Sequence, residues 1–464
     1  MSVYRSVASQ HFNERQTREL EQFCKEYRHF LDAAATERLA CKEIERQAFA
    51  AGFVRFEEAS GQTKRQLHVF DGRCGALVRI GSPNKLENGI VIVASHIDSP
   101  RLDVKPNPLT ESSGIALLKT RYYGGVKKYQ WLGIPLAMHG VAFLQDGRSV
   151  DISIGNGEDD PVFTITDLAP HLASNQIKKP AGEFIEGEKL NIIFASGGSS
   201  GASFSRTSGE KSIKDQIEER LHRDYGLSLE DFTSAEFEIV PAIQSKDVGL
   251  DRSFLGGYGQ DNRVCTFAAM KAIMACESEG ANLMFAFFDK EEIGSQGAHG
   301  ADSNLLERIF MRVFEQLGST DWFALKRSMA NSVVVSGDVN VGIDPNWKDV
   351  TEDLNCARMG AGVCLMKYTG GAGKRGANEA DAAFVAKVRR VLNESGVPWQ
   401  TGEIGKVDAG GGSTVAHYLA RIGASVIDAG PPLLSMHSPF EIVSKADIYS
   451  SYLAYKAIYE SFRR

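Results

Sequence analysis

The stretch Val91–Pro100, with the sequence VIVASHIDSP, constrains the fold of this chain more than any other. Its β-branched and small residues predict a short buried strand of a parallel sheet, ending at His96 and Asp98. The last side chains of such a strand lie at the carboxyl edge of the sheet, where α/β proteins bind their ligands. There His96 can bind a metal, while Asp98 accepts its other ring N–H and fixes the tautomer. The alternative is a satisfied structural pair.

The remaining chain predicts an α/β domain interrupted by a β-rich insert. Residues 17–51 have apolar residues at helical spacing, and the segments 67–70 and 75–79 are typical of strands. After about residue 104, short strand-like runs alternate with Gly and Pro until the 240s. Alternating helices and strands return from residue 251 onward. The expected insert elements are strands at 115–118, 140–144, 149–154, 162–165 and 236–241, a flexible loop at 196–208 and a helix at 212–224. The expected later elements are helices at 262–277, 303–317, 378–394, 413–422 and 445–462, and strands at 283–288, 332–336 and 424–427.

Composition excludes several classes of protein. The chain has 464 residues, 43 % of them hydrophobic and 24 % charged, which is typical of an ordinary soluble protein with two or three domains. A formal charge of −7 argues against a general nucleic-acid binder. The seven cysteines include no CxxC pair, which argues against a zinc ribbon or a disulfide framework and favours a reducing cytosol. With no apolar run of 18 residues and no signal-peptide pattern, we expect a cytoplasmic protein without a membrane span.

Metal-type ligands follow strand-like runs or begin helices at five places. Two imidazoles and three carboxylates suit a pair of divalent cations, because one carboxylate can bridge two ions. Zinc, cobalt and manganese all accept such a nitrogen and oxygen donor set. In the adjacent acidic pair, one carboxylate can bind metal while its neighbour takes a proton from water. Each acid alone is more typical of a solvated surface, so the prediction rests on all five sites together: His96, Asp261, Glu291-Glu292, Asp338 and His437.

Five segments together resemble the aspartyl aminopeptidase family of metallo-aminopeptidases, which includes vacuolar aminopeptidase I. They agree in order across roughly residues 90–445, and the bacterial aminopeptidase 1 branch is the most similar. The segments are ASHIDSPRLDVKP (94–106), GQDNR (259–263), DKEEIGSQGA (289–298), SGDVNVGIDP (336–345) and SMHSPFE (435–441).

The resemblance implies a fold and a site. The fold would be a mixed-sheet α/β aminopeptidase domain, residues 1–103 and 247–464, interrupted by a dimerisation insert at 104–246. Members assemble as dodecamers built from dimers. Two ions per subunit, zinc above all, would be held by two ligand sets that share Asp261. By analogy the first set is His96, Asp338 and Asp261, the second is Asp261, Glu292 and His437, Glu291 is the general base and Asp98 orients His96.

Four further residues are expected to contact substrate. His171 resembles an insert histidine that reaches a neighbouring subunit's active site. Lys374 and Arg375 lie where the family lines the pocket for the first substrate side chain, and a cation there favours an acidic residue. The insert segment 122–140 departs from the aspartyl-specific pattern, so a neutral first residue is also open, and His139 is expected only to pack. Gly411, in the run Gly410–Thr414, can present N–H groups to an oxyanion; a tight turn with Ser413 as N-cap is the alternative.

The expected function is that of a dinuclear metallo-aminopeptidase, an exopeptidase that needs a free substrate amine. A dinuclear amidohydrolase that acts on acylated amino acids is the alternative within enzymes. A non-catalytic oligomeric scaffold with a vestigial site is the alternative outside them, although the complete ligand set argues against it.

Overall fold

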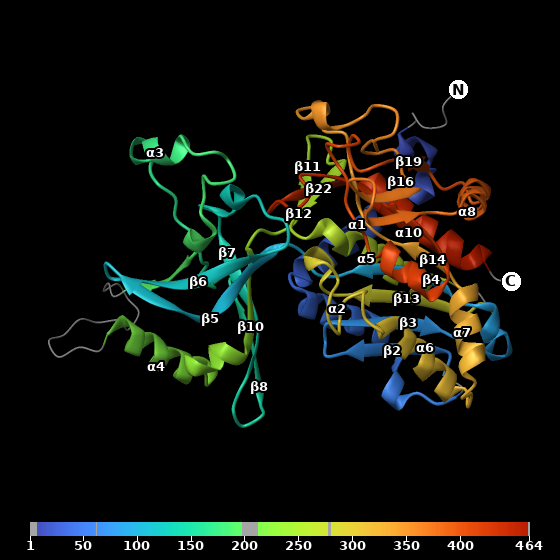
Figure 1. Cartoon of the computed structure of the whole chain (residues 1–464), viewed down its shortest axis with the longest axis horizontal. Helices are drawn as coiled ribbons and strands as arrows, with labels where there is room; N and C mark the ends of the chain where they lie inside the picture. The colour runs from blue at the N-terminus through green and yellow to red at the C-terminus, as the bar shows by residue number, and fades with distance from the viewer. Residues whose placement is uncertain (1–6, 62, 197–211, 277–279, 463–464) are drawn as a thin grey trace. The chain divides into compact units, whose positions relative to one another are not determined.

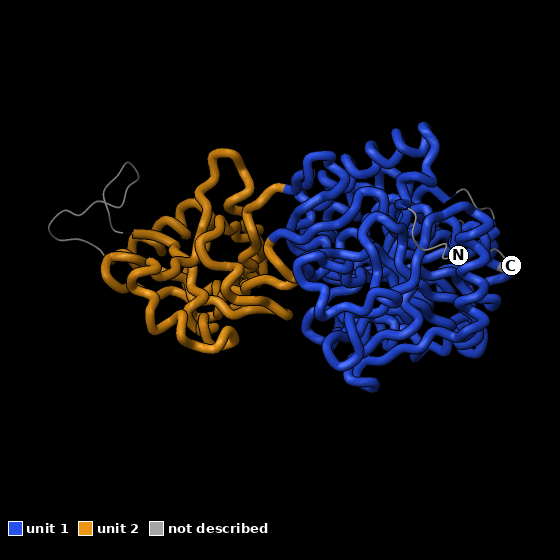
Figure 2. Tube along the Cα trace, turned by 90° about the horizontal axis from the view of Figure 1, so that it is seen from above, with its two compact units in different colours: residues 1–99, 245–436, 440–464 blue, residues 100–244, 437–439 orange. Residues whose placement is uncertain are grey.

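The computed structural model describes residues 7–61, 63–196, 212–276 and 280–462. The chain divides into two compact units (Figure 2). Unit 1 comprises residues 1–99, 245–436 and 440–464, and unit 2 comprises residues 100–244 and 437–439. The insert expected from the sequence comprises residues 104–246. None of the helices in the described residues is long and apolar enough to cross a bilayer.

Unit 1 is built on a nine-stranded mixed sheet, as the fold prediction requires (Figure 1). Strand β4 (Val91–His96) lies between β13 (Leu283–Phe288) and β14 (Val333–Ser336), and it is parallel to both. The strand predicted from VIVASH is therefore confirmed at the centre of the sheet. The full order is β1 (Val54–Arg55), β2 (Arg65–Phe70), β3 (Cys74–Arg79), β13, β4, β14, β20 (Ser425–Gly430), β16 (Val363–Met366) and β19 (Trp399–Thr401).

Helices cover both faces of this sheet. Successive side chains of the central strands point to opposite faces, and both sets are apolar, so each face needs a cover. Val91, Val93 and Phe285 belong to one apolar cluster, whereas Ile92 and Met284 belong to the other. The first cluster includes side chains of α1 (Glu14–Ala33), α2 (Glu37–Ala50), α5 (Gln260–Ala275), α8 (Ala382–Glu394) and α10 (Lys445–Ser461). The second includes side chains of α6 (Leu305–Gln316), α7 (Trp322–Asn331) and α9 (Ala416–Leu419).

Two smaller sheets complete unit 1. A five-stranded sheet runs in the order β11 (Lys246–Val248), β12 (Phe254–Gly257), β22 (Glu441–Ser444), β21 (Pro432–Leu434) and β15 (Asn340–Val341). Strands β17 (Tyr368–Gly371) and β18 (Arg375–Glu379) form a hairpin.

Unit 2 is built on a six-stranded antiparallel sheet. Its order is β8 (Ser149–Ile154), β7 (Leu136–Phe143), β10 (Ala235–Pro241), β5 (Arg101–Ser112), β6 (Ile115–Tyr123) and β9 (Ile192–Ser196). Helices α3 (Ser174–Ile177) and α4 (Ile213–Tyr225) belong to the same unit. The short strand-like runs between Gly and Pro residues predict such a β-rich unit.

Several elements differ from the sequence expectation. The helical segment 17–51 is two helices, because Thr36 caps the second by accepting a hydrogen bond from the Leu39 amide. The segment 162–165 is not a strand and forms one isolated bridge, Phe163 with Leu136. The predicted loop at 196–208 lies, apart from Ser196, outside the described residues. The helix expected at 413–422 is the single short turn of α9 followed by a 3-10 turn.

Candidate active site and metal centre

The parallel strands bring the predicted ligands to one edge of the main sheet. His96 is the last residue of β4 and pairs with Phe288, the last residue of β13. The chain after β13 continues directly into Glu291 and Glu292, while the chain after β14 reaches Asp338 two residues beyond its last residue. Because these strands are parallel, their carboxyl ends meet at the same edge, which is where α/β sheets hold ligands.

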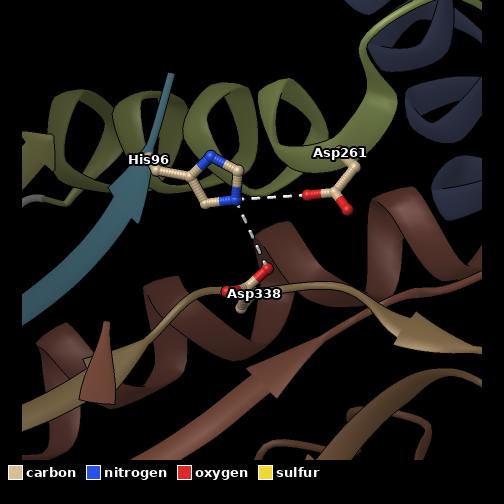
Figure 3. Close-up of side chains that lie close together, drawn as sticks. All are labelled: His96, Asp261 and Asp338. Atoms are coloured by element: carbon tan, nitrogen blue, oxygen red, sulfur yellow. Dashed lines mark ion pairs between the residues drawn. The ribbon is translucent and has the colours of Figure 1, made fainter. Parts of the chain in front are cut away.

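Three of the predicted ligands lie against one another (Figure 3). His96 Nε2 is 3.2 Å from Asp261 Oδ1 and 3.7 Å from Asp338 Oδ1. His96, Asp261 and Asp338 are 1 %, 4 % and 6 % exposed, so their donor atoms are almost withdrawn from solvent. His96 comes from a strand, Asp261 from the first turn of α5 and Asp338 from a loop. The site therefore exists only in the folded chain.

The acidic pair lies beside this trio. Glu291 Oε2 is 4.0 Å from His96 Nε2, and His96, Glu291 and Glu292 form a second group with metal-ligand spacing. Asp289 anchors the turn that carries the pair, since its carboxylate accepts a hydrogen bond from Arg73 Nε at 2.8 Å. Arg73 also pairs with the fully buried Glu37 at 2.6 Å.

Asp98 connects the histidine to the acidic pair. Its two carboxylate oxygens accept hydrogen bonds from the backbone N–H groups of Glu291 and Glu292, each at 3.1 Å. His96 Nδ1 lies 3.1 Å from the Asp98 carbonyl oxygen and 3.4 Å from its carboxylate. Donation from Nδ1 would leave the Nε2 lone pair available to a metal ion, which is the tautomer that a metal ligand needs.

Asp261 is held by two residues that the sequence analysis did not single out. Its backbone N–H donates to Glu441 Oε2 at 3.1 Å, and Ser99 Oγ donates to its carbonyl oxygen at 2.5 Å. Glu441 is 1 % exposed. Both residues lie in segments already quoted for the resemblance, ASHIDSPRLDVKP and SMHSPFE. A polar residue inside such a segment is the signal that could have identified them.

Gly337 lets the loop that carries Asp338 pass close to the sheet. Its N–H donates to the Ala94 carbonyl oxygen, and its own carbonyl oxygen accepts from Asn262 Nδ2, both at 2.6 Å. A Cβ at this position would lie 3.0 Å from the Tyr455 hydroxyl oxygen and 3.3 Å from the Ala94 carbonyl oxygen. A larger residue would therefore push Asp338 away from His96.

Crowding of carboxylates in a buried space shifts the pKa values of the site. Burial raises the pKa of Glu291 to about 8, and the charges of Asp338, Asp98 and Asp261 add to the effect, while His96 opposes it. Burial also raises the pKa of Asp338. Burial lowers the pKa of His96, but hydrogen bonds from its ring to the carboxylates of Asp261, Asp338 and Asp98 outweigh it, so the net shift is upward.

This donor set fits a divalent metal ion. Zinc binds imidazole nitrogen and carboxylate oxygen at about 2.0–2.2 Å, so adjacent ligand atoms of a tetrahedral site lie roughly 3.3–3.6 Å apart. The separations of 3.2 and 3.7 Å from His96 Nε2 are close to that value. A dication would also compensate the mutual repulsion of the buried carboxylates. The residues present therefore match the group that the resemblance implies.

The remaining predicted residues come from other segments of the chain. His437 lies in the three-residue segment grouped with unit 2, where its Nδ1 is 2.9 Å from the Gly125 carbonyl oxygen. His171 is exposed in unit 2, in the 3-10 turn Pro170–Leu172. Lys374 and Arg375 are exposed at the turn of the β17–β18 hairpin. Gly411 lines a cavity of about 470 Å³ in unit 1. Ser413 is not an N-cap, because the cap position of α9 is Val415.

Known proteins resemble this chain over nearly its whole length. Residues 30–459 match the model of the family described as aminopeptidase I zinc metalloprotease (M18). A probable M18 family aminopeptidase 1 of Thermotoga maritima is 44 % identical over 452 residues, covering 97 % of this chain and 98 % of the relative.

Solved structures share the fold of this chain. The crystal structure of an M18 family aminopeptidase from Thermotoga maritima has a TM-score of 0.92 at 43 % identity and covers 99 % of both chains. The structure of an mApe1 dodecamer from S. cerevisiae has a TM-score of 0.75 at 19 % identity, covering 95 % of this chain and 96 % of that one, a likeness of fold. This chain belongs to the aminopeptidase I zinc metalloprotease (M18) family and is a metal-dependent aminopeptidase.

Proposed function

We propose that this aminopeptidase uses two divalent ions per subunit and removes single residues from peptides with an unblocked amine. His96, Asp338 and Asp261 hold the first ion, and Asp261, Glu292 and His437 hold the second, with Asp261 as the bridge. Zinc is the ion best supported, because the family is one of zinc metalloproteases. Cobalt and manganese are the other ions that such donors accept.

Glu291 is the general base and acid of this proposal. When bound, the ions supply Lewis-acid polarisation of the scissile carbonyl and lower the pKa of water. Glu291 takes the proton of the attacking water and returns it to the leaving amine, which needs a carboxylate close to the ligands yet not committed to them. The contact that supports this role is the 4.0 Å separation from His96 Nε2. Asp98 fixes the position of Glu291 through its backbone N–H.

The substrate is held through its free amine and its first side chain. We infer that the α-amine contacts the carboxylate-rich edge, which makes the enzyme an exopeptidase. Lys374 and Arg375 approach an acidic first side chain through charge-assisted hydrogen bonds, while neutral residues remain substrates. Gly411, with its neighbours in the run Gly410–Thr414, presents backbone N–H groups to the substrate.

We infer further that the chain works as a homo-oligomer in a reducing compartment. The insert of residues 104–246 mediates dimerisation, His171 approaches a neighbouring subunit's active site, and dimers assemble into a dodecamer. The dodecameric relative of similar fold supports this assembly. The seven buried cysteines support a cytoplasmic location, since thiols persist where disulfides are kept reduced.

One observation carries the proposal: His96, Asp261 and Asp338 place three metal-type donor atoms together in an almost solvent-free space. The test is a mass-spectrometric cleavage panel of peptides that differ only at residue one: Asp, Glu, Leu, Lys and acetylated Leu. Each peptide is incubated with zinc, cobalt or manganese and again with a chelator. Elemental analysis of the purified protein measures ions per subunit.

The panel separates the possible outcomes. Chelator-sensitive loss of one residue, with the acetylated peptide spared and two ions per subunit, is the expected result. Cleavage of the acetylated peptide would instead indicate an amidohydrolase. One ion per subunit at full activity would contradict the second ligand set. No cleavage with any metal would contradict the proposal as a whole.

A further inference from the structure

A buried aspartate outside the proposed ligand set connects the main sheet to a glycine-rich loop. Asp428, in β20, is fully buried, and its Oδ1 accepts a hydrogen bond from Thr414 Oγ1 at 2.7 Å. Its neighbour in the strand pairing is Ser336 of β14, two residues before Asp338. The hydroxyl of Thr369, on β17, also faces this carboxyl closely enough to favour its charge. Asp428 therefore faces three segments: β14, β17 and the loop that contains Thr414.

The second oxygen of this carboxyl makes the cluster unusual. Within the described part of the chain, Asp428 Oδ2, Ser336 Oγ and Thr369 Oγ1 are buried and make no hydrogen bond of normal geometry. Buried polar atoms are nearly always bonded, and exceptions are typical of functional sites. A residue kept only for packing in this place would more often be apolar.

The loop that Asp428 holds forms the wall of a cavity. The cavity, of about 470 Å³, is lined by Thr369 and Gly370 of β17 and by residues 410–412. The two wall segments are joined by a hydrogen bond from Gly370 N–H to the Gly412 carbonyl oxygen at 2.7 Å. Gly411 has a φ of +126°, and a Cβ there would lie 2.8 Å from the Gly370 carbonyl oxygen. With glycine at these positions, the wall depends on a few polar contacts for its position.

We infer that Asp428 is a positioning residue: through Thr414 it holds the 410–414 loop and β17 against the strand that leads to Asp338. The inference rests on the proposed function, because it treats the cavity as the place where substrate meets the enzyme. Loss of this contact therefore weakens substrate binding rather than the chemical step. It leaves the metal ligands in place.

The test compares two substitutions of the loop threonine in the full-length protein. Thr414→Val removes the hydroxyl, whereas Thr414→Ser keeps it and serves as the conservative rescue. Thr120→Val is the matched control, because Thr120 is an equally buried threonine of unit 2 whose hydroxyl bonds to the Leu190 carbonyl oxygen. Each variant is measured for KM and kcat on the cleaved peptides, for zinc content, and for hydrogen exchange of the 410–416 amides.

We expect Thr414→Val to raise KM by roughly five- to tenfold with kcat changed by less than about twofold, as for a lost binding contact. The 410–416 amides should exchange faster, while those of β4 and the zinc content stay as in wild type. Thr414→Ser and Thr120→Val should keep the wild-type KM. An unchanged KM and unchanged exchange in Thr414→Val would overturn the inference, as would an equal rise in KM in Thr120→Val.

A second pair of variants tests Asp428 itself. Asp428→Ala removes the carboxyl to which Thr414 donates, and Asp447→Ala is its control. Asp447 is also a fully buried aspartate, but it accepts from the Gly360 and Gly362 amides. Faster 410–416 exchange in Asp428→Ala alone supports the positioning role, and equal exchange in both variants contradicts it. Because exchange needs no substrate, an inactive wild-type enzyme would refute the proposed function separately from this loop contact.

Discussion

Two buried clusters of charged side chains, one in each unit, are composed in opposite ways. In unit 1, His96, Asp261 and Asp338 gather at the carboxyl ends of parallel strands, and the acids there outnumber the cations. In unit 2, the buried Arg101 pairs with Asp103 at 2.9 Å and with Glu238 at 3.1 Å. Its guanidinium also lies 3.9 Å from the Tyr123 ring centroid.

The difference follows from strand direction. Parallel strands have their carboxyl ends at the same edge of a sheet. Polar side chains that follow these strands, from distant segments of the chain, therefore meet there and can carry the same charge. Antiparallel strands place partners side by side, and opposite charges there pair directly. His139 of unit 2 fits the second pattern, since both ring nitrogens have hydrogen-bond partners and burial lowers its pKa to about 4. In these two clusters, unbalanced buried charge coincides with the candidate active site, and balanced buried charge coincides with structural contacts of unit 2.

The largest expected effect is loss of the proposed base. Glu291→Gln should lower kcat by about a thousandfold or more, because the amide cannot take a proton, while zinc content stays as in wild type. Asp103→Asn removes a paired carboxylate of unit 2 and should change kcat by less than about twofold. Steady-state kinetics with elemental analysis measures both. Near-wild-type turnover in Glu291→Gln would remove the base from the proposal.

Loss of a ligand should affect metal binding next. Asp338→Asn should weaken zinc binding by about a hundredfold or more, since even residues that only support a ligand change affinity by about 10–100-fold. Competition with a fluorescent chelator measures the affinity, and circular dichroism checks that the chain is folded. Wild-type affinity would show that Asp338 supports the site without holding metal.

Breaking the balanced pair of unit 2 should cost stability instead. Arg101→Met leaves Glu238 buried without its cation and should lower the free energy of unfolding of unit 2 by about 3–5 kcal/mol. The double variant Arg101→Met, Glu238→Met should recover much of the loss, because no charge is then buried alone. Urea unfolding followed by hydrogen exchange in unit 2 distinguishes the two. A double variant as unstable as the single one would refute the charge-balance explanation.

The smallest effect should be equal in the two units. Asn13 caps α1 and Ser212 caps α4, and each forms a capping box with the residue three positions later. Asn13→Ala and Ser212→Ala should each cost about 1 kcal/mol, because a cap acts locally whatever the surrounding sheet. Thermal unfolding of the two variants measures the cost. A several-fold larger loss in one unit would mean that its cap also supports tertiary contacts.

Local pattern predicted most of the elements. Leu283–Phe288 and Ser149–Ile154 have the predicted bounds, because a buried apolar run and an alternating run both identify a strand directly. The helix expected at 378–394 begins at Ala382 instead, since Asn378 and Glu379 pair with β17. The helix α7 has no counterpart in the prediction, and the break at Thr36 was also overlooked. Strand pairing and capping overrode helical periodicity at these places.

The sequence by itself determined the kinds of donor atom, the strands that carry them and the order of the motifs. These are local properties, fixed by side-chain chemistry and hydrophobic period. Only the tertiary structure decided that His96 lies 3.2 Å from Asp261, 165 residues later in the chain. It also decided that Glu441 and Ser99 hold the backbone of Asp261, and that Thr414 bonds Asp428. Contacts of this kind depend on the parallel register of the sheet, which no single segment encodes.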